Sequence, residues 1–430
     1  MRCHAIAAAF LIVGASPVCS QALPHAAPAV EGFSAARLTR LQHFFEQAVD
    51  SNRVAGMTAM VTRHGKVIFE GAWGMADRES KHPMQLATRF RIASQSKAVT
   101  SVAAMLLIEE GRLGLSDRVS RFIPAFATTT VSAMVDSAGT KVRRIVPAKR
   151  QITVRDLLTQ TSGYSYGTDA AVSAAYAQEE LGPKAGYGWY FADKHEPICQ
   201  SIERIARLPA VAQPGEAWVY GYNSDILGCV IERASGMSLS DFFQQRIFAP
   251  LKMFNTSFCV KQADAAMLAT VYSLDGGTLT RAAEGPRGQG DYVGGPCLSF
   301  SGGAGLISTA GDYTRFLQML ANNGELEGTR LLSPNSVALM SSNQVGTLYG
   351  GSESGFGLGF SVLLDPGRAG VYGNAGLYGW GGAYHSTYWI DPADGIVAVL
   401  MTNLLPANGS QLHDRFRTLL YQARTTSAGR

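Results

Sequence analysis

Ser94-Gln95-Ser96-Lys97 stands at the junction of two segments with different patterns. Upstream, residues 88–93 form an extended run that ends at the serine. Downstream, residues 98–110 form an apolar stretch that predicts a helix, which Gly111 would close at its C-terminal end. The sequence therefore predicts that Ser94 lies at a helix N-terminus, where backbone N–H groups and the helix dipole favour a developing anion.

The spacing of Ser94 and Lys97 places the two side chains one helical turn apart on the same face. Burial disfavours the charged form of a lysine, so a buried lysine beside a serine can act as a base. This arrangement predicts a serine nucleophile with a lysine activator. The alternative from the motif alone is an N-capping serine followed by a solvated lysine, because capping serines are common.

Length and composition indicate a large globular protein. The chain has 430 residues and 46% hydrophobic content, enough for a sizeable core in one or two domains. Only 16% of residues are charged, the formal net charge is +4, and the one short basic run is residues 141–144. We therefore expect no nucleic-acid partner.

The N-terminus has the pattern of a secretory signal. Arg2 precedes a short apolar stretch, residues 5–15, and small residues near position 22 offer a cleavage site before Leu23. We expect a signal peptide over 1–22, a mature chain over 23–430, and a periplasmic or secreted location. No segment is long and apolar enough for stable membrane insertion.

Export permits disulfides among the four cysteines that would remain. Cys259 and Cys297 flank neighbouring loop or strand segments, and we expect them to pair. Cys229 lies in an apolar helical stretch and is interpreted as a buried thiol. No cysteine or histidine spacing fits a zinc site, so no metal is expected.

The order of predicted elements indicates an α/β (α+β) fold. A helix over 35–50, a hairpin over 57–75 and a hairpin over 386–401 with a closing helix over 411–421 place strands at both chain ends. The remaining predicted helices cover 154–159, 225–234, 239–248, 313–322 and 334–341. We expect an antiparallel sheet built from both ends and flanked by helices (23–115 and 300–430), with an inserted, mostly helical part (116–299) and a cleft at the junction. Residues 125–150 and 270–295 are interpreted as rich in loops.

Two further segments carry candidate site residues. Tyr220 lies in a loop before the 225–234 helix, where its hydroxyl could relay a proton for the serine and lysine, although a packed aromatic pair is the alternative. The segment Gly379-Trp380-Gly381-Gly382-Ala383 precedes the last hairpin. Its glycines let the backbone approach a ligand, so an N–H there could complete an oxyanion hole; the alternative is a simple bulge or turn.

These three segments together resemble the serine hydrolases of the β-lactamase and D-alanyl-D-alanine peptidase fold, and most closely the family VIII carboxylesterases. The resemblance spans nearly the whole mature chain, from Phe90-Arg91-Ile92-Ala93-Ser94 to Trp389-Ile390-Asp391-Pro392. It implies Ser94 as the nucleophile, Lys97 and Tyr220 as the base and acid pair, and the backbone N–H groups of Ser94 and Ala383 as the oxyanion hole. It also implies that substrate contacts Trp380, Gly381, Gly382 and Tyr222.

The sequence departs from the β-lactamases and peptidases of this fold at two motifs. Gly221-Tyr222 follows Tyr220 where those enzymes have x-Asn, and Trp380-Gly381-Gly382 replaces their Lys-Thr-Gly. The last lysine of the chain is Lys261, so no lysine is available there for a substrate carboxylate, which favours neutral esters. Gln160 and His385 also replace the usual histidine and glycine; His385 could line the pocket, but a packed or surface histidine is the better interpretation.

Residues 164–191 are unusually aromatic and include a second serine motif. Gly163-Tyr164-Ser165-Tyr166-Gly167 matches the nucleophile elbow of α/β-hydrolases, but the strand and helix that such an elbow needs are missing, so Ser165 is not expected to be catalytic. We expect the stretch to cover the cleft, with Trp189 and Tyr190 shaping the substrate pocket.

The resulting prediction is an exported serine carboxylesterase that acts on a small-molecule ester through an acyl-enzyme on Ser94, without a cofactor. The enzymatic alternatives are a β-lactamase, a D,D-peptidase or an acyltransferase on the same fold. A receptor that is acylated at Ser94 and never turns over is the alternative from a different class.

Overall fold

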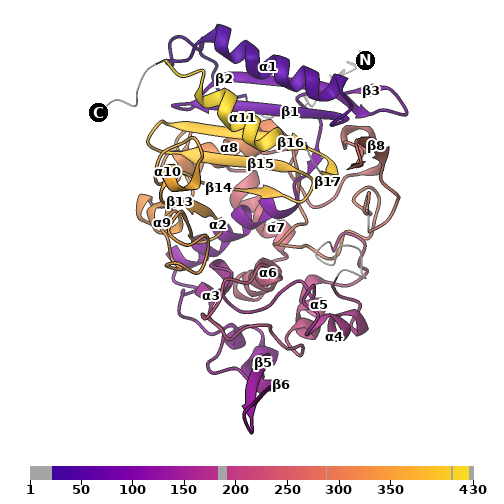
Figure 1. Cartoon of the computed structure of the whole chain (residues 1–430), viewed down its shortest axis with the longest axis vertical. Helices are drawn as coiled ribbons and strands as arrows, with labels where there is room; N and C mark the ends of the chain where they lie inside the picture. Colours follow the sequence, from indigo (N-terminus) through magenta and orange to yellow (C-terminus); the bar gives the residue numbers. More distant parts are fainter. Residues whose placement is uncertain (1–21, 183–190, 287, 408–409, 426–430) are drawn as a thin grey trace, which may run out of the picture.

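Both ends of the chain contribute to one antiparallel sheet of eight strands in the order β12-β13-β14-β15-β16-β1-β2-β3 (Figure 1). The computed structural model describes residues 22–182, 191–286, 288–407 and 410–425. The strands are β12 (Ser354–Phe356), β13 (Ser361–Leu363), β14 (Tyr378–Gly382), β15 (Ser386–Asp391), β16 (Ile396–Thr402), β1 (Gly56–Arg63), β2 (Lys66–Asp77) and β3 (His82–Pro83). The prediction of an antiparallel sheet built from both ends is therefore confirmed.

The central pair of strands joins the two ends of the sequence. β1 runs antiparallel to β16, in a register that places Met57 opposite Thr402 and Arg63 opposite Ile396. Every residue of both strands is buried, so side chains of both faces belong to packed cores. Alternate residues point to opposite faces, which means that helices must cover both sides of the sheet.

One face is covered by α1 (Ala35–Asp50) and α11 (Leu412–Tyr421), which Figure 1 shows side by side across the strands. Phe45 of α1 and Phe416 of α11 pack against each other, with ring centroids 5.6 Å apart. Trp389 of β15 packs on Phe416 at 4.9 Å. Leu38, Leu41 and Phe45 recur at helical spacing in α1 and belong to this smaller core. Leu412, Phe416 and Leu420 of α11 complete it from the second helix.

The other face carries the larger core and the inserted helical part. It includes α2 (Ser96–Glu109) and α8 (Ala310–Ala321), both almost entirely buried. The remaining helices include α3 (Val154–Leu158), α4 (Ser173–Gln178), α5 (Ile198–Ile205), α6 (Asn223–Ser235), α7 (Leu239–Phe243), α9 (Pro334–Met340) and α10 (Pro366–Ala369). Among the described residues, no helix combines the length and the apolar character that a bilayer span needs.

Two regions interpreted as loops contain strands. β5 (Thr130–Ser137) and β6 (Thr140–Pro147) form a hairpin that projects from the helical end (Figure 1). β7 (Tyr272–Asp275) and β8 (Thr278–Arg281) pair in a small sheet with β17 (Leu404–Ala407). Most of the first hairpin is exposed, so its sequence lacks the apolar alternation by which a buried strand is found.

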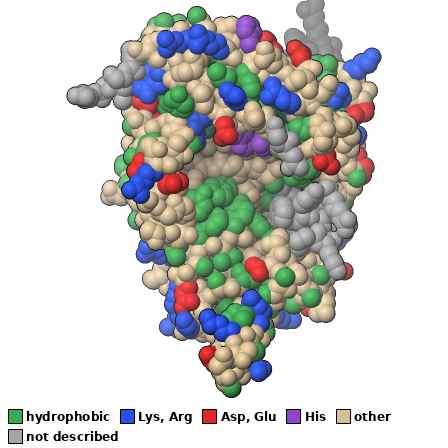
Figure 2. Space-filling view, viewed as in Figure 1, with side chains coloured by type: hydrophobic (Ala, Val, Ile, Leu, Met, Phe, Trp, Pro, Cys, Tyr) green, Lys and Arg blue, Asp and Glu red, His purple; other side chains and the backbone are tan. Residues whose placement is uncertain are grey.

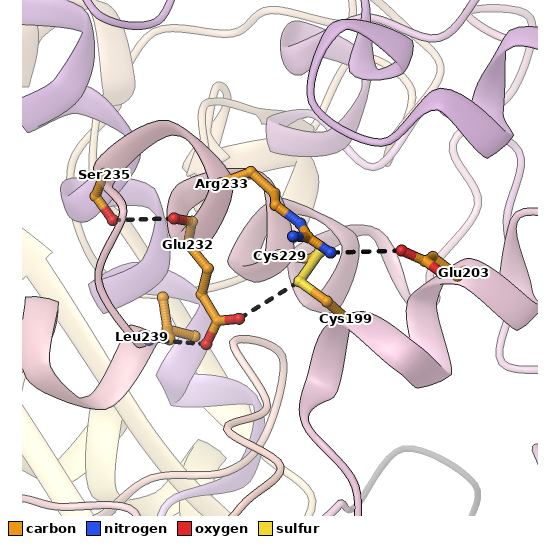
Figure 3. Close-up of a disulfide and its surroundings, with 7 residues drawn as sticks. All are labelled: Cys199, Glu203, Cys229, Glu232, Arg233, Ser235 and Leu239. Atoms are coloured by element: carbon orange, nitrogen blue, oxygen red, sulfur yellow. Dashed lines mark hydrogen bonds and ion pairs between the residues drawn. A yellow bond between two sulfur atoms is a disulfide. The ribbon is translucent and has the colours of Figure 1, made fainter.

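All four cysteines of the described chain form disulfides. Cys259 pairs with Cys297, which confirms that prediction. Cys199 pairs with Cys229, so the interpretation of Cys229 as a buried thiol is wrong. This bond joins α5 to α6, and Figure 3 shows it beside Glu232, which accepts a 2.9 Å hydrogen bond from the backbone N–H of Leu239. Cys229 does lie buried in a helix as expected, but its partner comes from a separate helix that sequence spacing does not reveal.

Candidate active site

Ser94 lies in a tight turn between a strand and a helix. β4 (Phe90–Arg91) leads into a 3₁₀ turn, Ala93–Gln95, and α2 begins at Ser96. Ala93 has a φ of 43°, in the left-handed region that a residue with a side chain rarely adopts. The backbone is therefore strained directly before Ser94, as is common at functional sites. Ser94 is 8% exposed.

Lys97 is buried and makes three hydrogen bonds. Its Nζ lies 3.2 Å from Oγ of Ser94, 2.9 Å from the hydroxyl of Tyr166 and 2.7 Å from the carbonyl oxygen of Gly303. Only 2% of the Lys97 side chain is exposed, so these three groups replace water. The carbonyl of Gly303 can only accept a hydrogen bond, which fixes one N–H of the lysine in that direction.

Tyr220 approaches Ser94 from the other side. Its hydroxyl lies 2.6 Å from Oγ of Ser94 and accepts a 3.2 Å hydrogen bond from Nε1 of Trp380. Nζ of Lys97 lies 4.7 Å from the centre of the Tyr220 ring, a distance typical of a cation–π contact. Trp218 stacks on Tyr220 with ring centroids 5.6 Å apart, so the ring is held between aromatic neighbours.

The loop that carries Tyr220 is fixed by buried amides. Nδ2 of Asn223 donates to Oε1 of Gln160 at 2.8 Å and to the carbonyl oxygen of Val219 at 3.1 Å. The backbone N–H of Val219 donates to the carbonyl oxygen of Gln160 at 2.8 Å. Gln160, one of the departures from the family pattern in the sequence, thus fixes the position of Val219, the residue directly before Tyr220.

Ser94 and Tyr220 line a cavity of about 730 Å³, a size suited to a small organic molecule. Figure 2 shows it as a hollow in the middle of the molecule, with hydrophobic side chains in its lower half and charged side chains around its upper rim. The other lining residues are Tyr166, Thr168, Tyr349, Ser361, Leu377, Gly379, Trp380, Gly381, Gly382, Ala383, Thr387, Tyr388 and Arg417. Trp380, Gly381, Gly382 and Ala383 thus lie where the sequence placed them, on the wall of the cavity.

The glycines of β14 allow close contact between backbone segments. A Cβ atom on Gly382 would lie 2.4 Å from the carbonyl oxygen of Ile92, which is closer than real Cβ contacts allow. Gly382 therefore lets the end of β14 pack against the turn that carries Ser94. The backbone of Ala383 follows directly, on the same cavity wall as Ser94. The sequence predicted that these glycines let the backbone approach a ligand. At Gly382 the close neighbour is instead the backbone of Ile92.

A buried carboxyl group lies behind Lys97. Asp225 is completely buried and accepts hydrogen bonds from the hydroxyl of Ser301 at 2.5 Å and from the N–H of Gly303 at 3.1 Å. Gly303 thereby links Asp225 to Lys97 through the N–H and the carbonyl group of a single residue. Burial raises the pKa of Asp225 to about 6, and the nearby Lys97 charge opposes that rise.

Two of the residues considered for the site from the sequence, Tyr222 and His385, do not line the cavity. Tyr222 is fully buried and does not line the cavity, so the prediction that it contacts substrate is corrected: its ring packs against Tyr166 at 5.0 Å, and its hydroxyl accepts from the N–H of Gly182. His385 stacks on His413 with ring centroids 4.1 Å apart, and burial lowers its pKa to about 3, which agrees with a packed histidine. Trp189 and Tyr190 lie outside the described residues.

Tyr166 lines the cavity, as expected for the aromatic stretch 164–191, but its contact with Lys97 was not predicted. It lies in the segment whose Ser165 resembled a nucleophile elbow, and the structure shows a loop there rather than a strand followed by a helix. Oγ of Ser165 accepts a 3.1 Å hydrogen bond from the N–H of Gly167. The aromatic composition of residues 164–191 was the available signal, because it pointed to this stretch as a wall of the cleft.

A serine held between a lysine and a tyrosine in this fold defines the class of β-lactamase-like serine hydrolases. The family model for beta-lactamase matches residues 41–423, and the chain belongs to that family. Among the described residues, no group of His, Cys, Asp and Glu side chains is placed to hold a metal ion.

Several relatives of this chain are esterases or acyltransferases. It is 32% identical to Esterase EstB of Burkholderia gladioli, over 86% of this chain and 91% of that protein. It is 28% identical to the monacolin J acid methylbutanoyltransferase of Aspergillus terreus, over 87% of this chain and 92% of that protein. The solved structure of EstCE1, described as a hydrolase with promiscuous acyltransferase activity, matches with a TM-score of 0.76 and 29% identity, over 90% of this chain and 98% of that one. The predicted resemblance to family VIII esterases is thus confirmed, as is the β-lactamase-like fold.

Proposed function

We propose that this protein hydrolyses carboxylic esters through an acyl-enzyme on Ser94. The observation that carries the proposal is the pair of contacts at Oγ of Ser94, 3.2 Å to Lys97 and 2.6 Å to Tyr220, inside a cavity of substrate size. A serine hydroxyl is a weak nucleophile, and a base within hydrogen-bond reach is what activates it. The esterase relatives support the same reaction.

Lys97 is the base. Its Nζ lies 3.2 Å from Oγ of Ser94 and is held there by hydrogen bonds to the carbonyl oxygen of Gly303 and the hydroxyl of Tyr166. The serine proton passes to Nζ while Oγ forms a bond to the ester carbonyl carbon. The carbonyl oxygen becomes an oxyanion, which the N–H groups of Ser94 and Ala383 stabilise.

Tyr220 is the general acid of the same reaction. As the tetrahedral intermediate collapses, the bond to the alcohol oxygen breaks and Tyr220 gives its proton to that oxygen. Lys97 then returns a proton to Tyr220, so both groups regain their starting states and the acyl group remains on Ser94. Water repeats the sequence as nucleophile and releases the carboxylic acid.

A fluorophosphonate label tests the nucleophile, with peptide mass spectrometry on the wild type and on Ser94→Ala. We expect one adduct on Ser94, steady hydrolysis of 4-nitrophenyl butyrate beyond one equivalent, and loss of both in the variant. An adduct on Ser165, or none, would refute the site. A single turnover would favour the acylated receptor instead.

Acyl transfer is the second candidate, because EstCE1 and the Aspergillus relative carry that activity in their descriptions. The acyl-enzyme on Ser94 would pass its acyl group to an alcohol rather than to water. Adding a primary alcohol to the ester assay distinguishes the two fates by the ratio of ester to acid formed. Hydrolysis of a cephalosporin at a rate comparable to that of esters would instead support the β-lactamase alternative.

We also infer that the protein is exported. The signal-like N-terminus and the two disulfides support this, since disulfides persist in oxidising compartments. N-terminal sequencing of the protein from a periplasmic or culture fraction would give Leu23 as the first residue. A chain that still starts at Met1 would contradict the inference.

A further inference from the structure

Arg417 is the single charged side chain among the described residues that line the cavity. It projects from α11, which together with α1 covers one face of the sheet. Ser94 belongs to the turn before α2, and α2 packs on the other face. The cavity therefore connects the reacting serine with a guanidinium group. The other lining side chains are aromatic, apolar or hydroxyl-bearing, so none of them neutralises this charge.

Arg417 has no hydrogen bond or ion pair with any residue that the structure describes. Its guanidinium lies 5.0 Å from the centre of the Trp389 ring, which holds it in place without neutralising it. Asp391 and Asp414 attract its charge, but neither forms an ion pair with it: Asp391 accepts hydrogen bonds from Tyr421 at 2.6 Å and from Asn374, and Asp414 is exposed. Burial lowers the pKa of Arg417, since its charge is poorly solvated where it stands.

Two arginines that are more deeply buried than the half-buried Arg417 are fully engaged. Arg91 donates to the carbonyl oxygens of Gln289 and Ala269 at 2.6 and 2.7 Å. Arg315 donates to the carbonyl oxygen of Leu251 and pairs with Glu327 at 2.8 Å. A desolvated cation without such partners is unfavourable, and an anion entering the cavity would restore the missing interactions.

Resting on the proposed function, we propose that Arg417 binds a carboxylate carried by the ester substrate, so that the preferred substrates are esters of ω-carboxy acids or similar anionic esters. The planar guanidinium matches a carboxylate with two parallel hydrogen bonds. This replaces the expectation of neutral esters. The absence of a lysine at Trp380-Gly381-Gly382 removes a cation from β14, and Arg417 supplies one from α11 instead.

Matched substrates test this directly on the wild-type enzyme. The substrates are 4-nitrophenyl hemiesters of adipic, pimelic and suberic acids and their methyl-capped neutral counterparts, whose chains are too long for easy attack by their own carboxylate. We expect a higher kcat/KM for at least one hemiester than for its capped counterpart. The preference should fall as NaCl is added, because salt screens the attraction.

The variant Arg417→Gln should lower the hemiester preference by about tenfold or more, the size of one charge-assisted hydrogen bond, and leave the capped esters nearly unchanged. Arg417→Lys keeps the charge and should keep part of the preference. Arg415→Gln is the matched control, because Arg415 is an exposed arginine on the same helix and does not line the cavity.

Equal kcat/KM for hemiesters and capped esters in the wild type would refute the carboxylate subsite without needing any variant. Equal losses on both substrates in Arg417→Gln would also refute it, since they indicate a structural role. Failure of the proposed function is a separate outcome, in which the wild type turns over neither class of ester and carries no label on Ser94.

Discussion

The hydroxyl of Tyr220 lies 2.6 Å from Oγ of Ser94, although the two residues belong to separate parts of the fold. Ser94 is placed by the turn before α2, and Tyr220 by the loop before α6. Trp380 of β14 donates a hydrogen bond to the same hydroxyl, so the end of the sheet also contributes to its position. Three elements therefore converge on one tyrosine oxygen.

Removing that oxygen should impair catalysis more than folding. Tyr220→Phe is expected to lower kcat on 4-nitrophenyl butyrate by about 10²–10⁴-fold, the usual contribution of a positioned acid or base. Tyr372→Phe is the matched control, because that tyrosine is exposed and lies outside the cavity wall. An activity within twofold of the wild type would exclude Tyr220 as the proton donor.

Tyr166→Phe tests the hydrogen bond that fixes Lys97. One N–H of the buried lysine would lose its acceptor, and an unsatisfied buried group costs about 1–3 kcal/mol. We expect kcat/KM to fall by roughly 5- to 150-fold, because 1.4 kcal/mol corresponds to a factor of ten. Tyr164→Phe, in the same loop but with its hydroxyl 3.4 Å from the carbonyl oxygen of Ala206, should have little effect. Similar losses in both variants would indicate a general disturbance of the loop.

Asp225→Asn should change the pH dependence of stability. Burial raises the pKa of Asp225 to about 6 from an unfolded value near 3.8, so the folded form binds this proton more tightly. The stability from that proton is present below about pH 4 and is lost as the pH rises through 6. We expect the asparagine variant to gain up to about 3 kcal/mol relative to the wild type at pH 8, and little at pH 4, in urea unfolding. A variant that is less stable than the wild type at pH 8 would contradict this.

Each disulfide should stabilise the helical part independently of catalysis. The loops closed by Cys199–Cys229 and Cys259–Cys297 span 30 and 38 residues, which corresponds to about 3–4 kcal/mol each in the chain-entropy account. Replacing either pair with alanine should lower the free energy of unfolding by about that amount in non-reducing buffer. Adding a reductant should then have a smaller further effect than it has on the wild type.

The sequence predicted those parts of the fold in which local pattern and burial agree. The helix predicted over 35–50 from its apolar periodicity, the hairpin predicted over 57–75 and the helix predicted over 411–421 all appear where expected, as α1, β1–β2 and α11. The β5–β6 hairpin lacks that signal because it is mostly exposed. The disulfide between Cys199 and Cys229 was not predicted, because the spacing of cysteines alone does not determine which of them pair.

In the site, residues within motifs were predicted and residues placed by tertiary contacts were not. Ser94 and Lys97 share one helical turn, so their contact follows from spacing. Tyr222 follows Tyr220 by two positions but lies behind Tyr166, because the chain turns into α6 between them. Arg417 belongs to an amphipathic helix whose sequence gives no sign that a cavity opens beside it.

The antiparallel pairing of β1 with β16 also means that the sheet is completed only when the C-terminal strands have been made. The turn that carries Ser94 is synthesised early, whereas β14, β15 and β16 follow only near the end of translation. A chain that stops before β14 has Ser94 and Lys97 but lacks the wall formed by Trp380, Gly382 and Ala383, and β1 then has no β16 beside it. A growing polypeptide therefore carries an incomplete cavity wall until β14 has been made.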